Sequence, residues 1–200
     1  MASKRLLGGL LCGGLSQRLG QDKALVRLAG KTLLERSYSL LVKSVEPSFL
    51  LTRKGQEYRG FPCLTEEGAR IGPIGAIAHA LNYAKEYDFT ALLVLACDLP
   101  FITKEWLDKL KESYLKDLDN HLAFVFKRAE SKKVENLVAI YRVGALPYFL
   151  KSIENKEYAV GAAIPKDLQK RLSYQKEESL AFHNLNTLDD LKLAQEFLKA

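Results

Sequence analysis

The stretch that decides the fold is LCGGLSQRLGQDK, residues 11–23. The apolar run before it, residues 6–11, is typical of a buried first strand. The segment KTLLE after it, residues 31–35, predicts the start of a helix. Glycine lets backbone N–H groups approach an anion closely, and successive amides form a positive concavity. Because Arg18 and Lys23 add formal charge, we expect this loop to bind phosphate groups.

The loop differs from the common phosphate-binding motifs. Five residues separate Gly14 from Gly20, Gln21 stands where a P-loop has lysine, and the pattern G-x-G-x-x-G is absent. An ordinary strand-to-helix turn would account for the glycines alone. It accounts poorly for Arg18 together with Asp22-Lys23 at this spacing, so the phosphate-binding interpretation is favoured.

Length and composition restrict the class of protein. Two hundred residues suit one domain over residues 1–200, and a hydrophobic fraction of 48% supports a sizeable core. No apolar run approaches the roughly 18 residues that a membrane-spanning helix needs, so we expect no membrane partner. Cys12, Cys63 and Cys97 form no C-x-x-C pair. Buried free thiols and a cytoplasmic location are therefore expected.

The net charge of +6 is compatible with several kinds of anionic partner. Lysines alternate with acidic residues at helical spacing, most clearly over residues 104–117, which is typical of a solvated helix surface. The three histidines lie far apart in the sequence, without metal-ligand spacing, so no zinc site is expected. We therefore expect a small polyanionic substrate and no nucleic-acid partner.

Strands and helices alternate over the first 115 residues, which indicates a parallel sheet with helices on both faces. Thr32 and Glu35 form a capping box for a helix over residues 32–45. Further strands are predicted at 48–52, 61–64, 90–97, 121–127, 136–141 and 171–174, and further helices from 72, from 104, over 144–154 and from 188. The expected fold is α/β: a single-domain, three-layer α/β/α architecture with a mostly parallel sheet and an antiparallel edge strand.

Asp98 follows the most apolar run, residues 90–97, which lacks alternation and so predicts a central parallel strand. Open α/β sheets bind ligands at the carboxyl ends of their strands, and a carboxylate is a hard oxygen ligand suited to Mg²⁺. The alternative is that Asp98 caps the next helix. Thr103 is the better cap, since Lys104 begins that helix.

Two further stretches are candidates for binding. Gly72-Pro73 begins a helix and would present free amides and a positive dipole end, although an ordinary helix start is the alternative. Asn184 and Asn186 precede a second capping box, Thr187-x-x-Asp190. A helix cap with an asparagine turn accounts for the last two residues but does not require both asparagines. Their amides can donate and accept hydrogen bonds without charge, which suits a pterin or a phosphate.

Four of these motifs, in this order, resemble the molybdenum cofactor guanylyltransferases, the MobA-like nucleotidyltransferases. LCGGLSQRLGQDK resembles LAGGxSxRMGxDK, GPIGAI resembles GPLxGI, CDLPF resembles CDxPF, and NLNTLDDL resembles NxNTPEDL. A fifth stretch, NLVAIY, resembles PLxALY with Asn136 in place of proline. The resemblance implies a Rossmann-like nucleotidyltransferase fold. It also implies transfer of GMP from GTP to molybdopterin or its molybdenum form, with release of pyrophosphate.

The resemblance also implies roles for individual residues. Arg18 and Lys23 would neutralise phosphate charge, and Asp98 would hold Mg²⁺, so these three form the catalytic set. The acceptor would meet Asn184 and Asn186. The remaining nucleotide contacts would be Leu11, Cys12, Gly13, Gly14, Thr52, Glu66, Gly72 and Pro73.

Two other functions fit the same motifs. A relative of this fold could use CTP on molybdopterin, or act on another small phosphorylated acceptor. A non-catalytic nucleotide-binding protein is an alternative of another class, although the presence of Lys23 and Asp98 favours an enzyme. Transient contacts with other proteins of molybdenum cofactor biosynthesis are expected from the guanylyltransferase interpretation.

Overall fold

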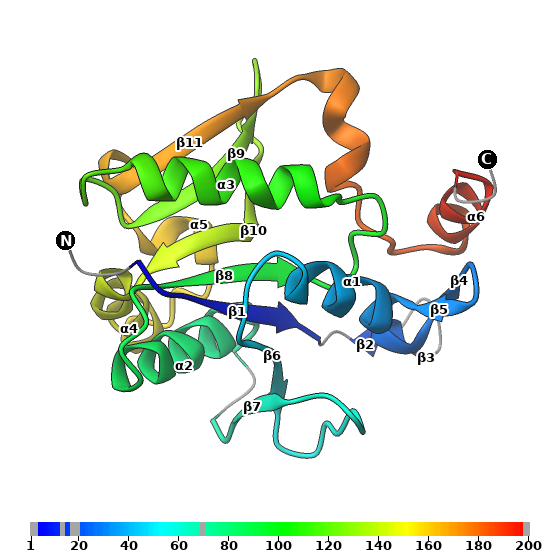
Figure 1. Cartoon of the computed structure of the whole chain (residues 1–200), viewed down its shortest axis with the longest axis horizontal. Coiled ribbons are helices and arrows are strands. Elements are labelled where there is room, and N and C mark those ends of the chain that lie inside the picture. Colours follow the sequence, from blue (N-terminus) through cyan, green and yellow to red (C-terminus); the bar gives the residue numbers. More distant parts are fainter. Residues whose placement is uncertain (1–3, 13–14, 17–20, 69–70, 198–200) are drawn as a thin grey trace.

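The computed structural model describes residues 4–12, 15–16, 21–68 and 71–197, and its centre is a seven-stranded sheet (Figure 1). The strand order is β11-β9-β10-β8-β1-β6-β7. The strands are β1 (Leu6–Leu11), β6 (Ser48–Arg53), β7 (Cys63–Glu66), β8 (Ala91–Ala96), β9 (Ala123–Arg128), β10 (Val134–Arg142) and β11 (Gln169–Tyr174).

The sheet is mostly parallel, which confirms the predicted α/β class. One detail of the prediction was wrong, because the antiparallel strand is not at the edge. β10 is antiparallel to both β8 and β9, and β11 then adds outside β9 in parallel. Val138 to Tyr141 of β10 are at most 1% exposed, so this strand has the burial of an interior strand. The chain after β10 returns to extend the sheet beyond β9, and the hairpin therefore becomes internal.

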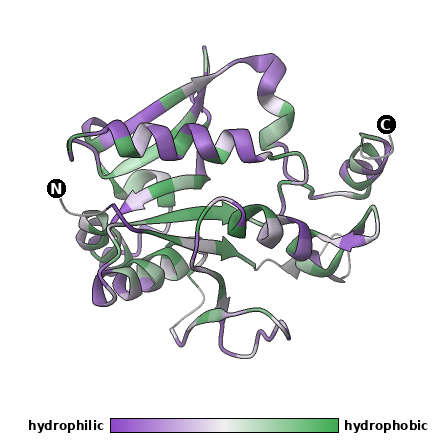
Figure 2. Ribbon diagram, viewed as in Figure 1, coloured by the Kyte–Doolittle hydropathy of each residue, from purple (hydrophilic) through white to green (hydrophobic). Residues whose placement is uncertain are grey.

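Helices cover both faces of the sheet and complete the predicted three layers (Figure 1). On one face α1 (Leu33–Val42) and α3 (Lys104–Lys116) share a core with η4 (Lys176–Phe182). On the other face lie α2 (Pro73–Glu86), α4 (Leu146–Glu154) and α5 (Val160–Ala163). The hydropathy colouring shows the apolar strands β1 and β8 between these layers (Figure 2).

Smaller elements gather beyond the carboxyl ends of β1 and β8 (Figure 1). Two short ribbons pair β2 (Leu15–Ser16) with β3 (Gln21–Asp22), and β4 (Arg27–Leu28) with β5 (Lys31–Thr32). The helix α6 (Leu188–Phe197) packs by Leu191 and Ala194 in a third, smaller apolar cluster. The 3-10 helices η1 (Lys23–Leu25), η2 (Val143–Ala145) and η3 (Lys166–Leu168) connect other elements.

Local sequence signals explain where the elements begin. The Thr32 hydroxyl accepts from the Glu35 amide at 3.1 Å, and the Glu35 carboxylate accepts from the Thr32 amide at 2.7 Å, which confirms the first capping box. The helix ends at Val42, a turn earlier than predicted. Gly8 in β1 allows close packing, because a Cβ there would collide with the Ser48 hydroxyl.

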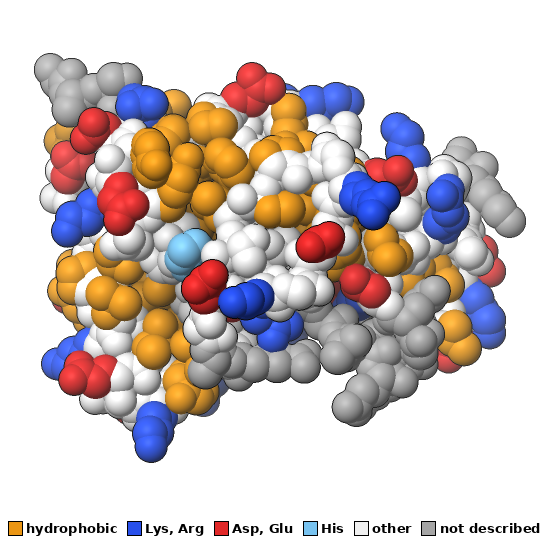
Figure 3. Space-filling view, turned by 90° about the horizontal axis from the view of Figure 1, so that it is seen from below, with side chains coloured by type: hydrophobic (Ala, Val, Ile, Leu, Met, Phe, Trp, Pro, Cys, Tyr) orange, Lys and Arg blue, Asp and Glu red, His pale blue; other side chains and the backbone are white. Residues whose placement is uncertain are grey.

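The surface mixes charges of both signs. The face in Figure 3 carries basic and acidic side chains among apolar ones, so the net charge of +6 is not gathered into one basic surface there. Within the described ranges, the helices are all too short or too polar to cross a membrane.

Candidate active site

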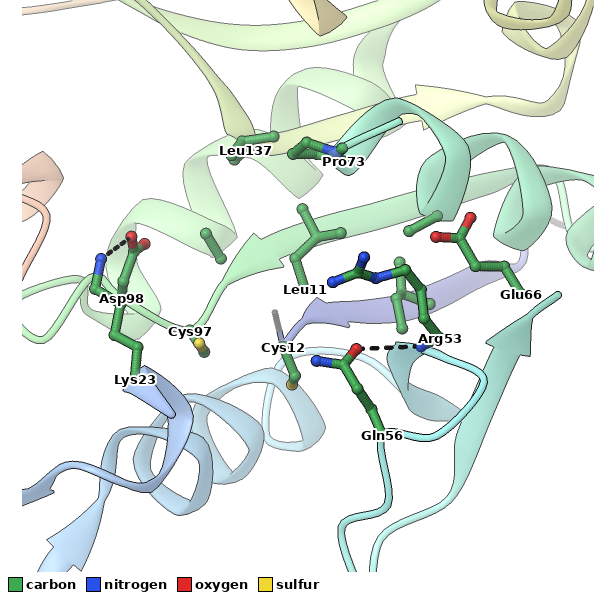
Figure 4. A pocket seen from close by; sticks show the side chains of 14 residues that line it. Leu11, Cys12, Lys23, Arg53, Gln56, Glu66, Pro73, Cys97, Asp98 and Leu137 are labelled. Atoms are coloured by element: carbon green, nitrogen blue, oxygen red, sulfur yellow. Dashed lines mark hydrogen bonds and ion pairs between the residues drawn. The ribbon is translucent and has the colours of Figure 1, made fainter. Parts of the chain in front are cut away.

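The site begins where two central strands end side by side. Leu11 of β1 pairs with Ala96 of β8, and the Cys97 amide donates to the Leu11 carbonyl at 3.2 Å. Cys12 and Asp98 follow at the same edge and open into a cavity of about 390 Å³ (Figure 4). This volume lies within the range of small-molecule sites, about 300–1,000 Å³. The cavity is lined by Leu11, Cys12, Lys23, Leu51, Arg53, Gln56, Glu66, Gly72, Pro73, Ala76, Ala96, Cys97, Asp98 and Leu137.

At one end of the cavity, a lysine, an aspartate and an asparagine form a hydrogen-bonded cluster. The Lys23 ammonium donates to Asp98 Oδ2 at 2.7 Å and to Asn186 Oδ1 at 2.7 Å. The side chains of Lys23 and Asp98 are only 11% and 19% exposed. Lys23 comes from the first loop, Asp98 from the end of β8, and Asn186 from the segment before α6. The fold therefore joins three of the predicted motifs at one point.

Asp22 holds the backbone turn from which the Lys23 side chain extends. Asp22 caps η1, because its Oδ1 accepts from the Ala24 amide at 3.0 Å. The other oxygen of Asp22, Oδ2, accepts from the Tyr58 hydroxyl at 2.8 Å. Both carboxylate oxygens of Asp22 are thus used to fix the turn from which the Lys23 side chain projects.

Asn186 is held in place by the second predicted capping box. Asp190 Oδ2 accepts from the amides of Asn186 and Thr187 and from the Thr187 hydroxyl, at 2.7–2.9 Å. Its other oxygen lies 2.7 Å from His183 Nε2. Burial opposes ionisation of Asp190, but these hydrogen bonds outweigh it and hold the pKa of the carboxyl well below its usual range. The carboxylate therefore stays charged and orders the segment that carries Asn186.

The opposite end of the cavity brings together Glu66, which the sequence predicted, and two residues that it did not, Arg53 and Gln56. Arg53 at the end of β6 extends its guanidinium into the cavity, with Gln56 and the Glu66 carboxylate nearby (Figure 4). Burial raises the pKa of Glu66, and the charge of Arg53 opposes that rise. Gly75 of α2 makes room for this carboxylate, because a Cβ there would lie 2.8 Å from Glu66 Oε2.

A signal for Arg53 was present in the sequence. Thr52 was predicted as the contact from this strand, but it is 1% exposed and its hydroxyl lies 2.9 Å from that of Thr65. Side chains alternate between the two faces of a strand, so Leu51 and Arg53 face the cavity and Thr52 faces away. A residue at the end of a strand reaches the cavity only if its side chain lies on the face of the strand that borders the cavity.

The start of α2 also faces the cavity. Gly72 adopts φ 84°, a conformation that favours glycine, and Pro73 occupies the first turn. Gly72, Pro73 and Ala76 all line the cavity. The first turn of this 14-residue helix, with its free amides, therefore borders the cavity.

A second cavity of about 420 Å³ adjoins the first and shares Pro73, Ala96 and Leu137 with it. The pairing of β10 with β9 is irregular between Glu135 and Ala139, and such bulges often re-aim side chains next to active sites. Asn184, predicted to meet the acceptor, lines this second cavity and not the first. The other lining residues are Leu99, Val134, Glu135, Asn136, Val138, Tyr158, Ala159, Val160 and Gly161.

Most predicted site residues come together in the structure. Of the predicted nucleotide contacts, the first cavity is lined by Leu11, Cys12, Lys23, Glu66, Gly72, Pro73 and Asp98. Gly13, Gly14 and Arg18 lie outside the described residues.

The predicted Mg²⁺ site depends on the oxygen atoms that the protein offers at Asp98. Over residues 4–12, 15–16, 21–68 and 71–197, no group of three His, Cys, Asp or Glu side chains is placed to hold a metal ion. Asp98 Oδ1 is buried and has no hydrogen-bond partner among these residues, whereas Oδ2 is bonded to Lys23. A protein site with a single carboxylate fits Mg²⁺, which often takes its other ligands from substrate phosphates and water.

Comparisons with known proteins show which class of enzyme has this fold and this site. The structure of molybdopterin-guanine dinucleotide biosynthesis protein A from Archaeoglobus fulgidus is similar over 96% of this chain and 98% of that one, with a TM-score of 0.75 and 25% identity. The fold and site define a Rossmann-like α/β nucleotidyltransferase. A family model described as MobA-like NTP transferase domain matches residues 8–169, and the chain belongs to this family.

Curated relatives agree with this assignment. A probable molybdenum cofactor guanylyltransferase from Thermococcus sibiricus is 30% identical over 199 residues, covering 94% of this chain and 96% of the relative. A molybdenum cofactor biosynthesis bifunctional protein from Synechocystis sp. is 33% identical over 74% of this chain. The match spans 42% of that longer protein, so the chain corresponds to less than half of its length.

Proposed function

We propose that this nucleotidyltransferase transfers GMP from GTP to the terminal phosphate of molybdopterin or its molybdenum form and releases pyrophosphate. The names of its relatives in Archaeoglobus and Thermococcus support this substrate pair. The observation that carries the proposal is the Lys23–Asp98 pair at one end of a cavity of about 390 Å³. A cation for phosphates and a carboxylate for Mg²⁺ are the two charges that the reaction needs.

The reaction joins two anions. An oxygen of the acceptor phosphate attacks the α-phosphorus of GTP, and the bond from that phosphorus to the pyrophosphate oxygen breaks in line with the attack. Because little covalent work falls to the protein, alignment and charge neutralisation dominate catalysis. No covalent enzyme intermediate is required.

Lys23 is suited to neutralise the phosphates. An ammonium has three N–H donors, and Asp98 and Asn186 take two of them. The third can donate to a phosphate oxygen while the other two keep the side chain in position. Arg18, from the same loop, is proposed to supply a second positive charge.

Asp98 is proposed to hold Mg²⁺ through its free oxygen, Oδ1. A Mg²⁺ ion held by Asp98 would supply neutralisation of the triphosphate charge and so would favour departure of pyrophosphate. Asp98 Oδ2 accepts from Lys23, so this one carboxylate would neutralise both the ammonium and the metal ion.

The base is proposed to lie at the end lined by Arg53 and Glu66. Guanine offers the acceptors O6 and N7, which match the paired donors of an arginine. It also offers N–H donors at N1 and N2, which match a carboxylate. Cytosine carries one exocyclic amine beside ring acceptors, so an arginine and a carboxylate together favour guanine.

The acceptor is proposed to occupy the second cavity. That cavity shares three lining residues with the first, so a phosphate bound at their junction can reach the α-phosphorus. Asn136 and Asn184 provide uncharged donors and acceptors for the polar edges of a pterin.

Calorimetric titration of GTP, CTP and ATP with Mg²⁺ tests the nucleotide, and pyrophosphate release with molybdopterin tests the transfer. We expect GTP to bind most tightly and pyrophosphate to appear only with the acceptor present. Preferential binding of CTP would make the protein a cytidylyltransferase. Nucleotide binding without pyrophosphate release would favour a non-catalytic nucleotide-binding protein.

A further inference from the structure

Tyr58 makes a contact with the phosphate loop that none of the motifs explains. It lies between β6 and β7, is 8% exposed, and packs in the same core cluster as Cys12 and Ala24. Its hydroxyl donates to Asp22 Oδ2 at 2.8 Å. Burial and this hydrogen bond raise the pKa of Tyr58 far above its usual value, so the hydroxyl remains a donor at any physiological pH.

The contact acts on the residue next to Lys23. Asp22 Oδ1 caps the Ala24 amide, and Tyr58 holds the other oxygen, so the carboxylate is fixed from two sides. Without the tyrosine hydroxyl, Asp22 could rotate and release the turn. The Lys23 ammonium, which reaches Asp98 and Asn186 at 2.7 Å each, depends on the direction in which this turn projects it.

The same segment also reaches the other end of the cavity. Gln56, two residues before Tyr58, lines the cavity, and its side chain accepts from the Arg53 amide at 3.3 Å. Figure 4 shows Arg53 and Gln56 away from the end that holds Lys23 and Asp98. Residues 53–58 therefore contact the base end directly and the phosphate end through Asp22.

We propose that Tyr58 is a positioning residue, which holds Lys23 at the phosphates through Asp22 and keeps the two ends of the nucleotide site in register. The inference rests on the proposed nucleotidyl transfer for its kinetic consequence. The structural consequence of the inference, an ordered turn at Asp22–Ala24, is independent of the proposed nucleotidyl transfer.

The test compares two tyrosines that each lose only a hydroxyl. In Tyr58→Phe the ring stays packed and the bond to Asp22 is lost. Tyr38→Phe is the matched control, because the Tyr38 hydroxyl also donates to a buried partner, the Ser48 carbonyl, at 3.0 Å, and its ring packs on Phe61. A merely structural role for Tyr58 predicts that the two variants behave alike.

We expect Tyr58→Phe to lower kcat by about 10- to 100-fold, the cost of a misplaced reacting group. The KM for GTP should stay within about threefold, as expected when a group acts mainly in the transition state. In a Lys23→Ala background, Tyr58→Phe should change kcat by less than about twofold, because the two residues act through one group. Unchanged kcat in Tyr58→Phe, or a full effect in both backgrounds, would overturn the inference.

Hydrogen exchange of the Ala24 amide gives a readout that needs no substrate. We expect exchange to be faster in Tyr58→Phe than in the wild type, and unchanged in Tyr38→Phe. Faster exchange in a protein that transfers no nucleotide would refute the proposed function but keep the positioning role. Active protein with the same exchange and kcat in all three forms would refute the positioning role alone.

Discussion

Lys23 and Asp98 stand 75 residues apart in the sequence, and their side chains meet at 2.7 Å. Both side chains are largely shielded from water, and each charge is compensated by the other. The pair sits where the first loop meets the end of β8. It links the phosphate-binding motif to the candidate Mg²⁺ ligand.

Replacing Lys23 tests its role against a purely structural one. We expect Lys23→Ala to lower turnover by at least about 100-fold, the cost of removing one charge-stabilising donor. Thermal unfolding should show a loss of no more than about 3 kcal/mol for the unpaired Asp98. As a control, Lys104→Ala removes an exposed ion pair with Asp108 and should cost under about 1 kcal/mol with normal turnover. A large loss of stability with retained turnover would contradict the proposed role of Lys23.

Replacing Asp98 tests whether this carboxylate holds Mg²⁺. In Asp98→Asn the side chain keeps its shape, but the charge that attracts Mg²⁺ is lost. We expect calorimetry to show that Mg²⁺ strengthens GTP binding to the wild type and does so far less in the variant. EDTA should abolish transfer by the wild type. Normal Mg²⁺-dependent turnover in Asp98→Asn and Asp98→Ala would remove Asp98 from the metal site.

Replacing Gly75 tests the proposed position of the base at the Arg53–Glu66 end of the cavity and leaves the lining side chains themselves in place. In Gly75→Ala the new Cβ would lie 2.8 Å from Glu66 Oε2 and 3.0 Å from Ile71 Cγ1, so the carboxylate must move. We expect GTP affinity to fall about 10- to 150-fold, since one charged hydrogen-bonding partner is worth roughly 1.5–3 kcal/mol. CTP affinity should change less. Gly68→Ala is the control, because a Cβ there meets nothing within 4 Å; equal effects of the two variants would argue against a base contact by Glu66.

Asp117, which lines neither of the two cavities described above, allows a prediction of how stability depends on pH. Its carboxylate accepts from Arg142 at 3.1 Å and lies 2.7 Å from His121 Nδ1. Burial opposes ionisation, but these hydrogen bonds outweigh it and lower the pKa of Asp117. The ionised group therefore stabilises the fold above its unfolded pKa, about 3.9. That stabilisation is lost as the pH falls through the lower, folded pKa.

Urea unfolding between pH 7 and pH 3 measures this contribution. We expect the wild type to lose stability on acidification below about pH 4, and Asp117→Asn to lose less over the same range. At pH 7, Asp117→Ala should cost about 1–3 kcal/mol, because the buried Arg142 loses one hydrogen-bonded carboxylate and keeps its ion pair with Asp119. Identical pH profiles for wild type and Asp117→Asn would show that other carboxyl groups control acid unfolding.

Several parts of the site could be predicted because they are local. Leu11 ends one apolar strand, Cys12 follows it, and Asp98 lies two residues beyond the end of another. Parallel strands bring their carboxyl ends to one edge of the sheet. The two capping boxes are also local, since each bonds residues three positions apart. The positions of these groups follow from strand periodicity and helix geometry.

Other parts depend on contacts between segments that the sequence does not pair. Arg53 and Gln56 carry no motif, and they become site residues because β6 lies beside β1 with this face toward the cavity. Leu137 reaches the cavity through an irregular register in β10. Tyr58 meets Asp22 across 36 residues through a hydrogen bond that no periodicity predicts.

The sequence by itself determined the α/β class, the family and which residues stand at the ends of β1 and β8, because these depend on short runs whose geometry is set by local backbone preferences. Only the tertiary structure decided that β10 is internal, that Lys23 is bonded to Asp98 and Asn186, and that Arg53 faces the cavity. These outcomes depend on the order and register of strands far apart in the chain. That order is set by the burial of two apolar faces of the sheet at once, which is a property of the whole fold and not of any single segment.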